Sequence, residues 1–151
     1  MYLIDTNIHA SFLLQTYEKD PVSTAYTHYL NTIALSERVI TDFILGEFET
    51  FIIQVVPSRL KLNSIDKKKL KQLAYDYIDR ITHNCTLITP QIQTLHKARD
   101  MYFDNYKTHY LSFVDCLILA TAQENTYTIL TKDIRMNTIA KQLHIQVPKV
   151  V

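Results

Sequence analysis

Short hydrophobic runs alternate along the chain with longer segments in which hydrophobic residues recur at helical spacing. The short runs predict strands; they lie at Tyr2–Ile4, Arg38–Thr41, Thr86–Ile88, Thr128–Leu130 and Ile145–Val147. The longer segments predict helices with one buried face; they are Ile8–Tyr17, a segment after Pro21, Asp42–Val56, a segment from about Ser64 to Asn84, residues 90 to about 106, Ser112–Asn125 and Ile134–Leu143.

Several helix boundaries depend on single residues. Asn7 is the expected N-cap of the first helix, because asparagine side chains accept hydrogen bonds from the free amides of a first turn. Pro57 is expected to close the third helix, since proline lacks the amide hydrogen that a helix interior needs. Ser64 or Asp66 is expected to cap the fourth helix, after a loop over residues 58–65.

Short strands separated by helices predict a parallel sheet covered on both faces, which is a three-layer α/β/α sandwich. No repeat and no Pro/Gly/Ser-rich linker divides the chain, so we expect a single domain over residues 1–151. In such sheets, ligands bind beyond the carboxyl ends of the strands. Asp5 and Asp133 each lie just beyond the end of an expected strand, so both acids are expected at one edge of the sheet.

Composition narrows the function classes. The chain has 151 residues, of which 47% are hydrophobic and 21% charged, as in ordinary globular proteins. A net charge of +1 excludes a strongly basic body that binds duplexes by charge alone. The single glycine, Gly46, excludes a P-loop and a dinucleotide-binding loop. Cys85 and Cys116 form no CxxC pair and no stretch is apolar enough to span a bilayer, so we expect a reduced, cytoplasmic protein.

Three of the acids have two possible roles. Asp5 and Asp133 lie where a strand gives way to a helix, a position at which aspartate is favoured as a cap. Asp115 comes three residues after Ser112, which is the spacing of a capping box with Asp in place of Glu. Capping and a functional role are therefore both open at these positions.

Apolar surroundings favour a functional role for Asp115 and for Glu47. The helix around Asp115 is hydrophobic nearly all round, and Glu47 projects from an apolar stripe. A carboxylate in such a setting is costly unless it is paired or bound to a metal. The pattern alone does not choose Glu47 over Asp42 and Glu49 on the same segment. Gly46 is a modest sign of a close approach there, because a mid-helix glycine costs about 0.5–1 kcal/mol against alanine.

Several carboxylates gathered at one edge would repel one another unless a cation lay between them. Oxygen ligands favour magnesium or manganese over zinc, and the six histidines show no HExxH or paired ligand spacing. A carboxylate-held divalent ion can activate water and stabilise charge on a phosphodiester. The same ion would let a chain of near-neutral charge attract an RNA backbone.

Four motifs follow one another in order and cover essentially the whole chain; they are Tyr2-Leu3-Ile4-Asp5-Thr6-Asn7, Phe43-Ile44-Leu45-Gly46-Glu47-Phe48, Phe113-Val114-Asp115-Cys116-Leu117-Ile118-Leu119-Ala120-Thr121-Ala122, and Ile129-Leu130-Thr131-Lys132-Asp133. Together they resemble the motifs of the PIN domain family, and most closely those of its VapC-type toxin ribonucleases. The resemblance implies a PIN-like sandwich and a magnesium- or manganese-dependent endoribonuclease that cuts single-stranded or structured RNA with metal-activated water.

The resemblance also implies particular residues and partners. It assigns the catalytic metal ligands to four acids, Asp5, Glu47, Asp115 and Asp133. It implies that Asn7 and Thr131 support the site by hydrogen bonding. Such proteins commonly form homodimers, and the toxin of a type II toxin–antitoxin pair is silenced by a cognate antitoxin whose segment fills the acidic groove.

Two features depart from the family pattern. The family often follows its last acid with a second acid and an aromatic residue, whereas this chain has Arg135 and Met136. This difference weakens the support for Asp133 as a fourth ligand and for a second metal ion. The segment over residues 57–84 is long for a minimal toxin and is a candidate for substrate or partner recognition. Lys132 and Arg135, beside the expected site, are candidate phosphate contacts.

Three alternative functions stay open. The chain could be a catalytically weak PIN-like module that binds RNA or protein, and retention of all four acids argues against this. It could also be a housekeeping RNA-processing nuclease rather than a toxin. A phosphatase that uses Asp5 as a covalent nucleophile is disfavoured, because Asn7 lies where that chemistry needs a second acid.

Overall fold

The computed structural model describes residues 1–17, 19–105 and 110–150. Its centre is a parallel sheet of four strands in the order β3-β2-β1-β4. The strands are β1 (Tyr2–Ile4), β2 (Arg38–Thr41), β3 (Thr86–Ile88) and β4 (Thr128–Leu130), and all four lie at their predicted positions. In register, Leu3 of β1 is opposite Val39 of β2 and Ile129 of β4.

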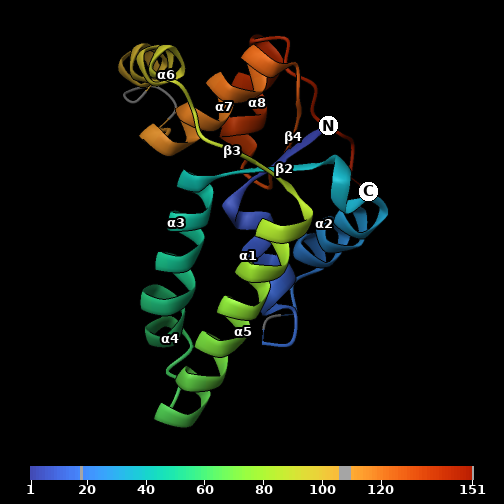
Figure 1. Ribbon diagram of the computed structural model, residues 1–151, viewed down its shortest axis with the longest axis vertical. Coiled ribbons are helices and arrows are strands. Elements are labelled where there is room, and N and C mark those ends of the chain that lie inside the picture. Colours follow the sequence, from blue (N-terminus) through green and yellow to red (C-terminus); the bar gives the residue numbers. More distant parts are fainter. Residues whose placement is uncertain (18, 106–109, 151) are drawn as a thin grey trace.

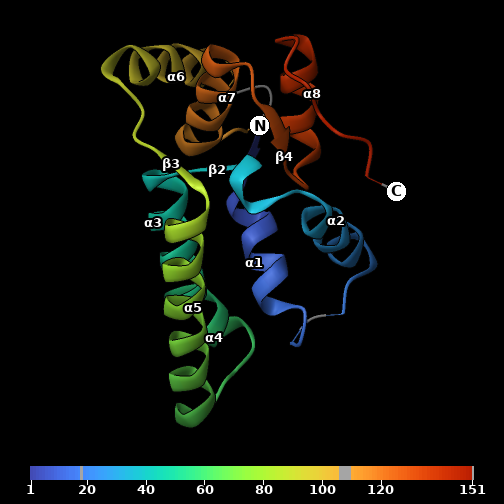
Figure 2. The ribbon, with the colours of Figure 1, turned by 45° about the vertical axis from the view of Figure 1, so that its right-hand side comes forward.

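Helices cover both faces of the sheet, which confirms the three-layer α/β/α prediction (Figures 1 and 2). One layer contains α6 (Ile92–Asn105), α7 (Phe113–Asn125) and α8 (Ile134–Gln142). The other contains α1 (Thr6–Leu14), α2 (Pro21–Thr32), α3 (Asp42–Thr50), α4 (Val56–Arg59) and α5 (Ser64–Asn84), with a π-helical segment η2 (Phe51–Val55) between α3 and α4 and a 3₁₀ turn η1 (Leu35–Glu37) before β2.

The order in which successive strands are added to the sheet reverses at β1: β2 and β3 lie on one side of it, and β4 lies on the other. From β1 the chain passes through α1 and α2 to β2 and then through α3–α5 to β3, always toward the same edge. From β3 it crosses the opposite face through α6 and α7 and returns to β4, on the other side of β1. Such a switch point opens a crevice between the carboxyl ends of the two strands that flank it. The residues that follow β1 and β4 therefore face each other.

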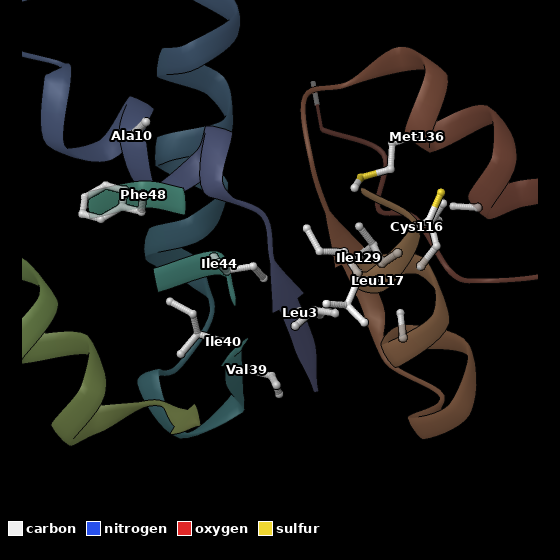
Figure 3. Close-up of a cluster of buried hydrophobic side chains, with 14 of the residues drawn as sticks. Leu3, Ala10, Val39, Ile40, Ile44, Phe48, Cys116, Leu117, Ile129 and Met136 are labelled. Atoms are coloured by element: carbon white, nitrogen blue, oxygen red, sulfur yellow. The ribbon is translucent and has the colours of Figure 1, made fainter. Parts of the chain in front are cut away.

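Most side chains of β1, β2 and β4 are buried on both faces of the sheet, whereas Leu87 of the edge strand β3 is exposed. Figure 3 shows Ala10, Ile40, Ile44 and Phe48 on one side of β1, and Cys116, Leu117, Ile129 and Met136 on the other. Strands covered on both faces appear in sequence as continuous apolar runs, which is why runs of three residues were sufficient to predict them.

Several predicted boundaries are wrong for local reasons. Asn7 lies inside the first turn of α1, so it is not the N-cap; that position is Asp5. Asn63 caps α5 through a hydrogen bond from the Asp66 amide at 2.9 Å, in place of Ser64 or Asp66. Pro57 does not close the helix, because it lies in the first turn of α4, where a proline needs no amide hydrogen.

The ends of the chain's last elements also differ from the prediction. Residues 145–147 form no strand, since Gln146 makes one backbone hydrogen bond to the edge of β4, from Ile129 at 3.0 Å, and Pro148 follows without a donor. Helix α6 ends at Asn105, and residue 106, the predicted end, lies outside the described residues. None of the described helices is long and apolar enough to cross a membrane.

A buried histidine joins α1 to α5. His9 Nδ1 lies 2.8 Å from the hydroxyl of Tyr77, and both rings pack beside Phe48 of α3. Burial, reinforced by the positive charge of Arg38, lowers the pKa of His9 from 6.5 to about 3. His9 is therefore still neutral in the folded protein near pH 6.5, where the same residue begins to take up a proton in the unfolded chain.

This difference predicts an acid-sensitive contribution to stability. A group whose folded pKa is depressed contributes stability that is complete above its unfolded pKa, here 6.5, and is lost as the pH falls. Between pH 7 and pH 5, His9 should remove about 2 kcal/mol from the free energy of unfolding. His9→Gln cannot titrate and should lack this loss, as measured by urea unfolding at both pH values. An equal pH dependence in both proteins would contradict the prediction.

Candidate functional site

The Asp5 carboxylate lies at the switch point, directly after β1. Its side chain is 4% exposed. It accepts hydrogen bonds at Oδ2 from the Thr131 hydroxyl, at 2.6 Å, and from the Asn7 side-chain amide. Burial raises the pKa of Asp5 from 3.8 to about 7; the Thr131 hydrogen bond opposes this shift, and the negative charges of Asp115 and Glu47 add to it. Asp5 occupies the N-cap position of α1 but makes no capping hydrogen bond, so capping does not account for it.

Asn7 and Thr131 connect the ends of β1 and β4. The Asn7 amide nitrogen donates to the Thr131 hydroxyl oxygen at 3.0 Å, and its carbonyl oxygen accepts from the Lys132 backbone amide at 3.1 Å. The Thr131 oxygen also accepts from the Asp133 backbone amide at 3.0 Å. These bonds fix the orientation of the Asp5 carboxylate from both sides.

Glu47 comes to the same place from α3. The Thr6 hydroxyl donates a hydrogen bond to Glu47 Oε2 across 41 residues of sequence. Asp42 and Glu49 project from the exposed part of the same helix. Of the three acids among which the sequence pattern could not choose, Glu47 is the one that lies beside Asp5.

Asp115 approaches from α7, on the other side of the sheet. It forms the predicted capping box, because its backbone amide donates to the Ser112 hydroxyl at 3.1 Å and its Oδ2 accepts from the Ser112 amide at 2.7 Å. It nevertheless faces the site, since its charge acts on Asp5. Capping and proximity to the site are combined in this residue.

The three acids line a common pocket of about 200 Å³. Its walls also include Thr6, Asn7, Ala10 and Phe51. In the part of the chain that the structure describes, no three acidic, histidine or cysteine side chains stand close enough together to ligate one ion as they are oriented here. Glu47 and Asp115 instead direct one oxygen each to a donor of the protein, Thr6 and Ser112 respectively.

Asp133 is placed differently from the other three acids. It is the N-cap of α8, and its Oδ1 accepts hydrogen bonds from the amides of Arg135 and Met136 at 2.7 and 3.2 Å. The Arg135 guanidinium donates to both of its oxygens, from Nε at 3.3 Å and from Nη2 at 2.9 Å. Asp133 is absent from the lining of the acidic pocket.

Lys132 is held against α1 and α2. Its ammonium group donates to the hydroxyls of Ser11 and Ser23, the latter at 2.8 Å. Of the two predicted phosphate contacts, Arg135 is thus the one whose side chain is close to the acids, because the negative charge of Asp115 also acts on it.

The sequence model of the PIN domain family matches residues 2–142. The chain is a PIN domain. PIN domains are generally nucleases, and PIN nucleases typically use divalent metals. No curated protein matches the chain significantly in sequence.

Solved structures share the fold of this PIN domain. VapC20 of Mycobacterium tuberculosis, described as a toxin that cleaves the sarcin–ricin loop, superposes with a TM-score of 0.68 at 13% identity, covering 92% of this chain and 95% of that one. FitAB bound to an IR36 DNA fragment gives 0.70 at 17% identity, with 98% and 94% covered. FitAcB from Neisseria gonorrhoeae gives 0.66 at 17% identity, with 99% and 97% covered. At these identities the likeness establishes the fold.

An apolar groove of about 730 Å³ adjoins the acidic pocket of the PIN domain and shares Glu47 and Phe51 with it. Phe43, 39% exposed, and Val55, 46% exposed, line it from α3 and η2. Gly46 also lines it, and a methyl group added at Gly46 would meet no atom within 4 Å. In the sequence, Gly46 is a modest sign that another group packs closely against this helix, and no atom of the described residues does so.

Sequence reasoning missed Thr6 and Ser112 as residues that orient acids of the PIN domain. Thr6 holds Glu47, and the Ser112 amide holds Asp115. Thr6 follows Asp5 directly, and only the packing of α3 beside α1 shows which side chain its hydroxyl meets. The capping-box spacing did predict the Ser112–Asp115 contact, although not its place in the site.

The raised pKa of Asp5, caused by burial and then by the neighbouring acids, predicts that Asp5 destabilises the folded PIN domain at neutral pH. Its folded pKa of about 7 exceeds the unfolded value of 3.8, so the contribution to stability is complete below pH 3.8 and is lost as the pH rises through 7. Relative to wild type in chelating buffer, Asp5→Asn should therefore gain about 2–3 kcal/mol in unfolding free energy between pH 5 and pH 8. Urea unfolding at both pH values measures this gain. An equal difference between the two proteins at both pH values would show that the pKa of Asp5 is not raised in the folded protein.

The open space at Gly46 predicts that an alanine is tolerated there. Gly46→Ala should raise the free energy of unfolding by about 0.5–1 kcal/mol, because alanine is the better helix former and its methyl group enters the groove without a clash. Chemical denaturation of the isolated protein measures this change. A loss of stability would contradict the prediction and show that a methyl group is not accommodated at this position.

Proposed function

We propose that this PIN domain is a magnesium- or manganese-dependent endoribonuclease, and that it is the toxin of a type II toxin–antitoxin pair. The observation that carries the proposal is the convergence of Asp5, Glu47 and Asp115 on one pocket at the sheet switch point. Asp5 follows β1, while Glu47 and Asp115 come from helices on opposite faces of the sheet, and Asp5 is buried with its charge uncompensated.

The residues present fit a divalent ion. Burial of Asp5 beside two further carboxylates disfavours its charged form, and a hard cation would reverse this effect. Among the described residues, protein hydrogen bonds engage one oxygen each of Glu47 and Asp115, and the other oxygen of each is available. Carboxylate oxygens are ligands that magnesium and manganese prefer.

In the proposed reaction, Asp5, Glu47 and Asp115 would hold the ion; Asp133, the fourth ligand that the resemblance implies, does not line their pocket. When bound, the ion would supply an activated water and would stabilise charge on the phosphodiester. The chain's own residues orient the ligands. Asn7 and Thr131 hold Asp5, the Thr6 hydroxyl holds Glu47, and the Ser112 amide holds Asp115. Supports of this kind keep the acids in place while an RNA strand enters and leaves.

The apolar groove supports an antitoxin as partner. A segment with apolar side chains would cover Phe43 and Val55, and a basic residue at its end would reach Glu47 and neutralise the acidic pocket. The solved relatives include a named toxin, VapC20, and the assembly FitAB. We further propose a homodimer in the cytoplasm, as expected from the family resemblance. A small antitoxin gene immediately upstream would support the toxin role.

The nuclease proposal predicts metal-dependent cleavage that requires Asp5. Purified protein should cut single-stranded or stem-loop RNA with manganese, and should not cut it with chelator. Asp5→Asn should lower the rate by about 100-fold or more, because it removes a central carboxylate. The matched control is Asp100→Asn, which neutralises an exposed aspartate that pairs with Arg99 on α6. It should cleave like wild type.

Two outcomes would overturn the proposal. Cleavage that survives Asp5→Asn would place the activity elsewhere or in a contaminant. If RNA is bound but neither single-stranded nor structured RNA is cut with manganese, the chain is a binding module instead.

A further inference from the structure

The Asp133 carboxylate is fully engaged by donors of its own chain. It accepts two backbone amides at the start of α8 and two donors of the Arg135 guanidinium, all within 3.3 Å. Despite partial burial, these hydrogen bonds keep the pKa of Asp133 below its ordinary value. A carboxylate that is already compensated in this way gains little from a metal ion.

Asp5 has the opposite environment. Among the described residues, the charges that act on it are those of Asp115 and Glu47, both negative. Its hydrogen-bond donors, Thr131 and Asn7, are neutral. The demand for a cation is therefore concentrated at the three acids of the pocket, and Asp133 lies outside this group.

Arg135 lies between the two environments. Nε and Nη2 point to Asp133, while Nη1 lies 3.5 Å from the Tyr110 carbonyl oxygen, at the limit of a hydrogen bond. The side chain is 54% exposed, so a solvated polyanion can reach it. The charge of Asp115 also acts on Arg135, so the guanidinium lies within electrostatic reach of one acid of the pocket.

We infer that Asp133 is not a metal ligand in this chain but a positioning residue for Arg135, and that the Arg135 guanidinium binds a phosphate of the RNA beside the three-acid pocket. A guanidinium fixed by a carboxylate on two of its nitrogens can still offer the third to a phosphate oxygen, a stronger acceptor than the Tyr110 carbonyl. This inference rests on the proposed function and narrows it to one divalent ion per chain.

The first test counts manganese ions by titration calorimetry on the full chain. Wild type should bind one ion. Asp133→Asn keeps an N-capping side chain and should change the dissociation constant by less than about threefold, whereas Asp5→Asn and Asp115→Asn should raise it by about tenfold or more. The inference is overturned if wild type binds two ions and Asp133→Asn loses one, or if Asp133→Asn weakens binding about as much as Asp115→Asn.

The same titration separates this inference from the proposed function. If wild type binds no manganese, or if Asp5→Asn binds it as wild type does, the proposed metal site is wrong and the inference falls with it. If Asp5→Asn weakens binding and Asp133→Asn does so equally, the nuclease proposal stands and only the inference falls.

The second test measures RNA affinity by fluorescence anisotropy in the Asp5→Asn background, where no cleavage is expected. Arg135→Gln should weaken binding of a labelled single-stranded RNA by about fivefold or more. It should also reduce the slope of log Kd against log salt by about 0.7, the value for one phosphate contact on a single strand. Arg135→Lys, which retains the charge, should keep the slope.

Arg99→Gln is the matched control, because Arg99 also pairs with an aspartate, Asp100, at 2.9 Å on an exposed helix. It should leave both affinity and salt slope unchanged. Thermal unfolding verifies that each variant is folded. If Arg135→Gln behaves like Arg99→Gln, Arg135 does not contact RNA and the inference is wrong.

Discussion

The arrangement of the site depends on one enclosed carboxyl group. Asp5 follows an inner strand of the sheet, with β2 on one side and β4 on the other, so its side chain is almost fully buried and reaches the surface only through the acidic pocket. A charge in that position is unfavourable unless other groups compensate it, so the neighbouring side chains determine which state of Asp5 is favoured. Asn7 and Thr131 bind it from two segments that are 124 residues apart, and two further acids approach from helices on opposite faces of the sheet.

The fold was largely predictable because its signals are local. The four strands are short apolar runs next to polar residues, and in β1, β2 and β4 burial on both faces leaves no alternation of apolar and polar residues that could confuse the pattern. Pro57 and Asn7 misled for the same reason, since each is typical of a helix boundary and each lies inside a first turn instead. A pattern shows that a residue suits a helix terminus, but not which turn of the terminus it occupies.

The site was predictable only in part, since its acids could be named but their partners could not. Glu47 could not be chosen over Asp42 by spacing, because the choice depends on the Thr6 hydroxyl from another helix. Capping and site membership looked like alternatives for Asp115, yet one oxygen of its carboxylate serves the cap while its charge acts on Asp5. Asp133 carries the same sequence signal as Asp5 and has a different environment, because Arg135 folds back onto it.

The π-helical segment Phe51–Val55 affects which residues are buried along the continuous helical stretch formed by α3, η2 and α4. Ile44, Phe48, Ile52 and Val56 are all buried at four-residue intervals. In a regular α-helix such a series drifts about 40° around the axis at each step, because one turn holds 3.6 residues. The wider turn takes up an extra residue and returns Val56 to the inner side. The wider turn thus offsets the drift of the buried positions where η2 packs against α5, while α3 before it packs against α1.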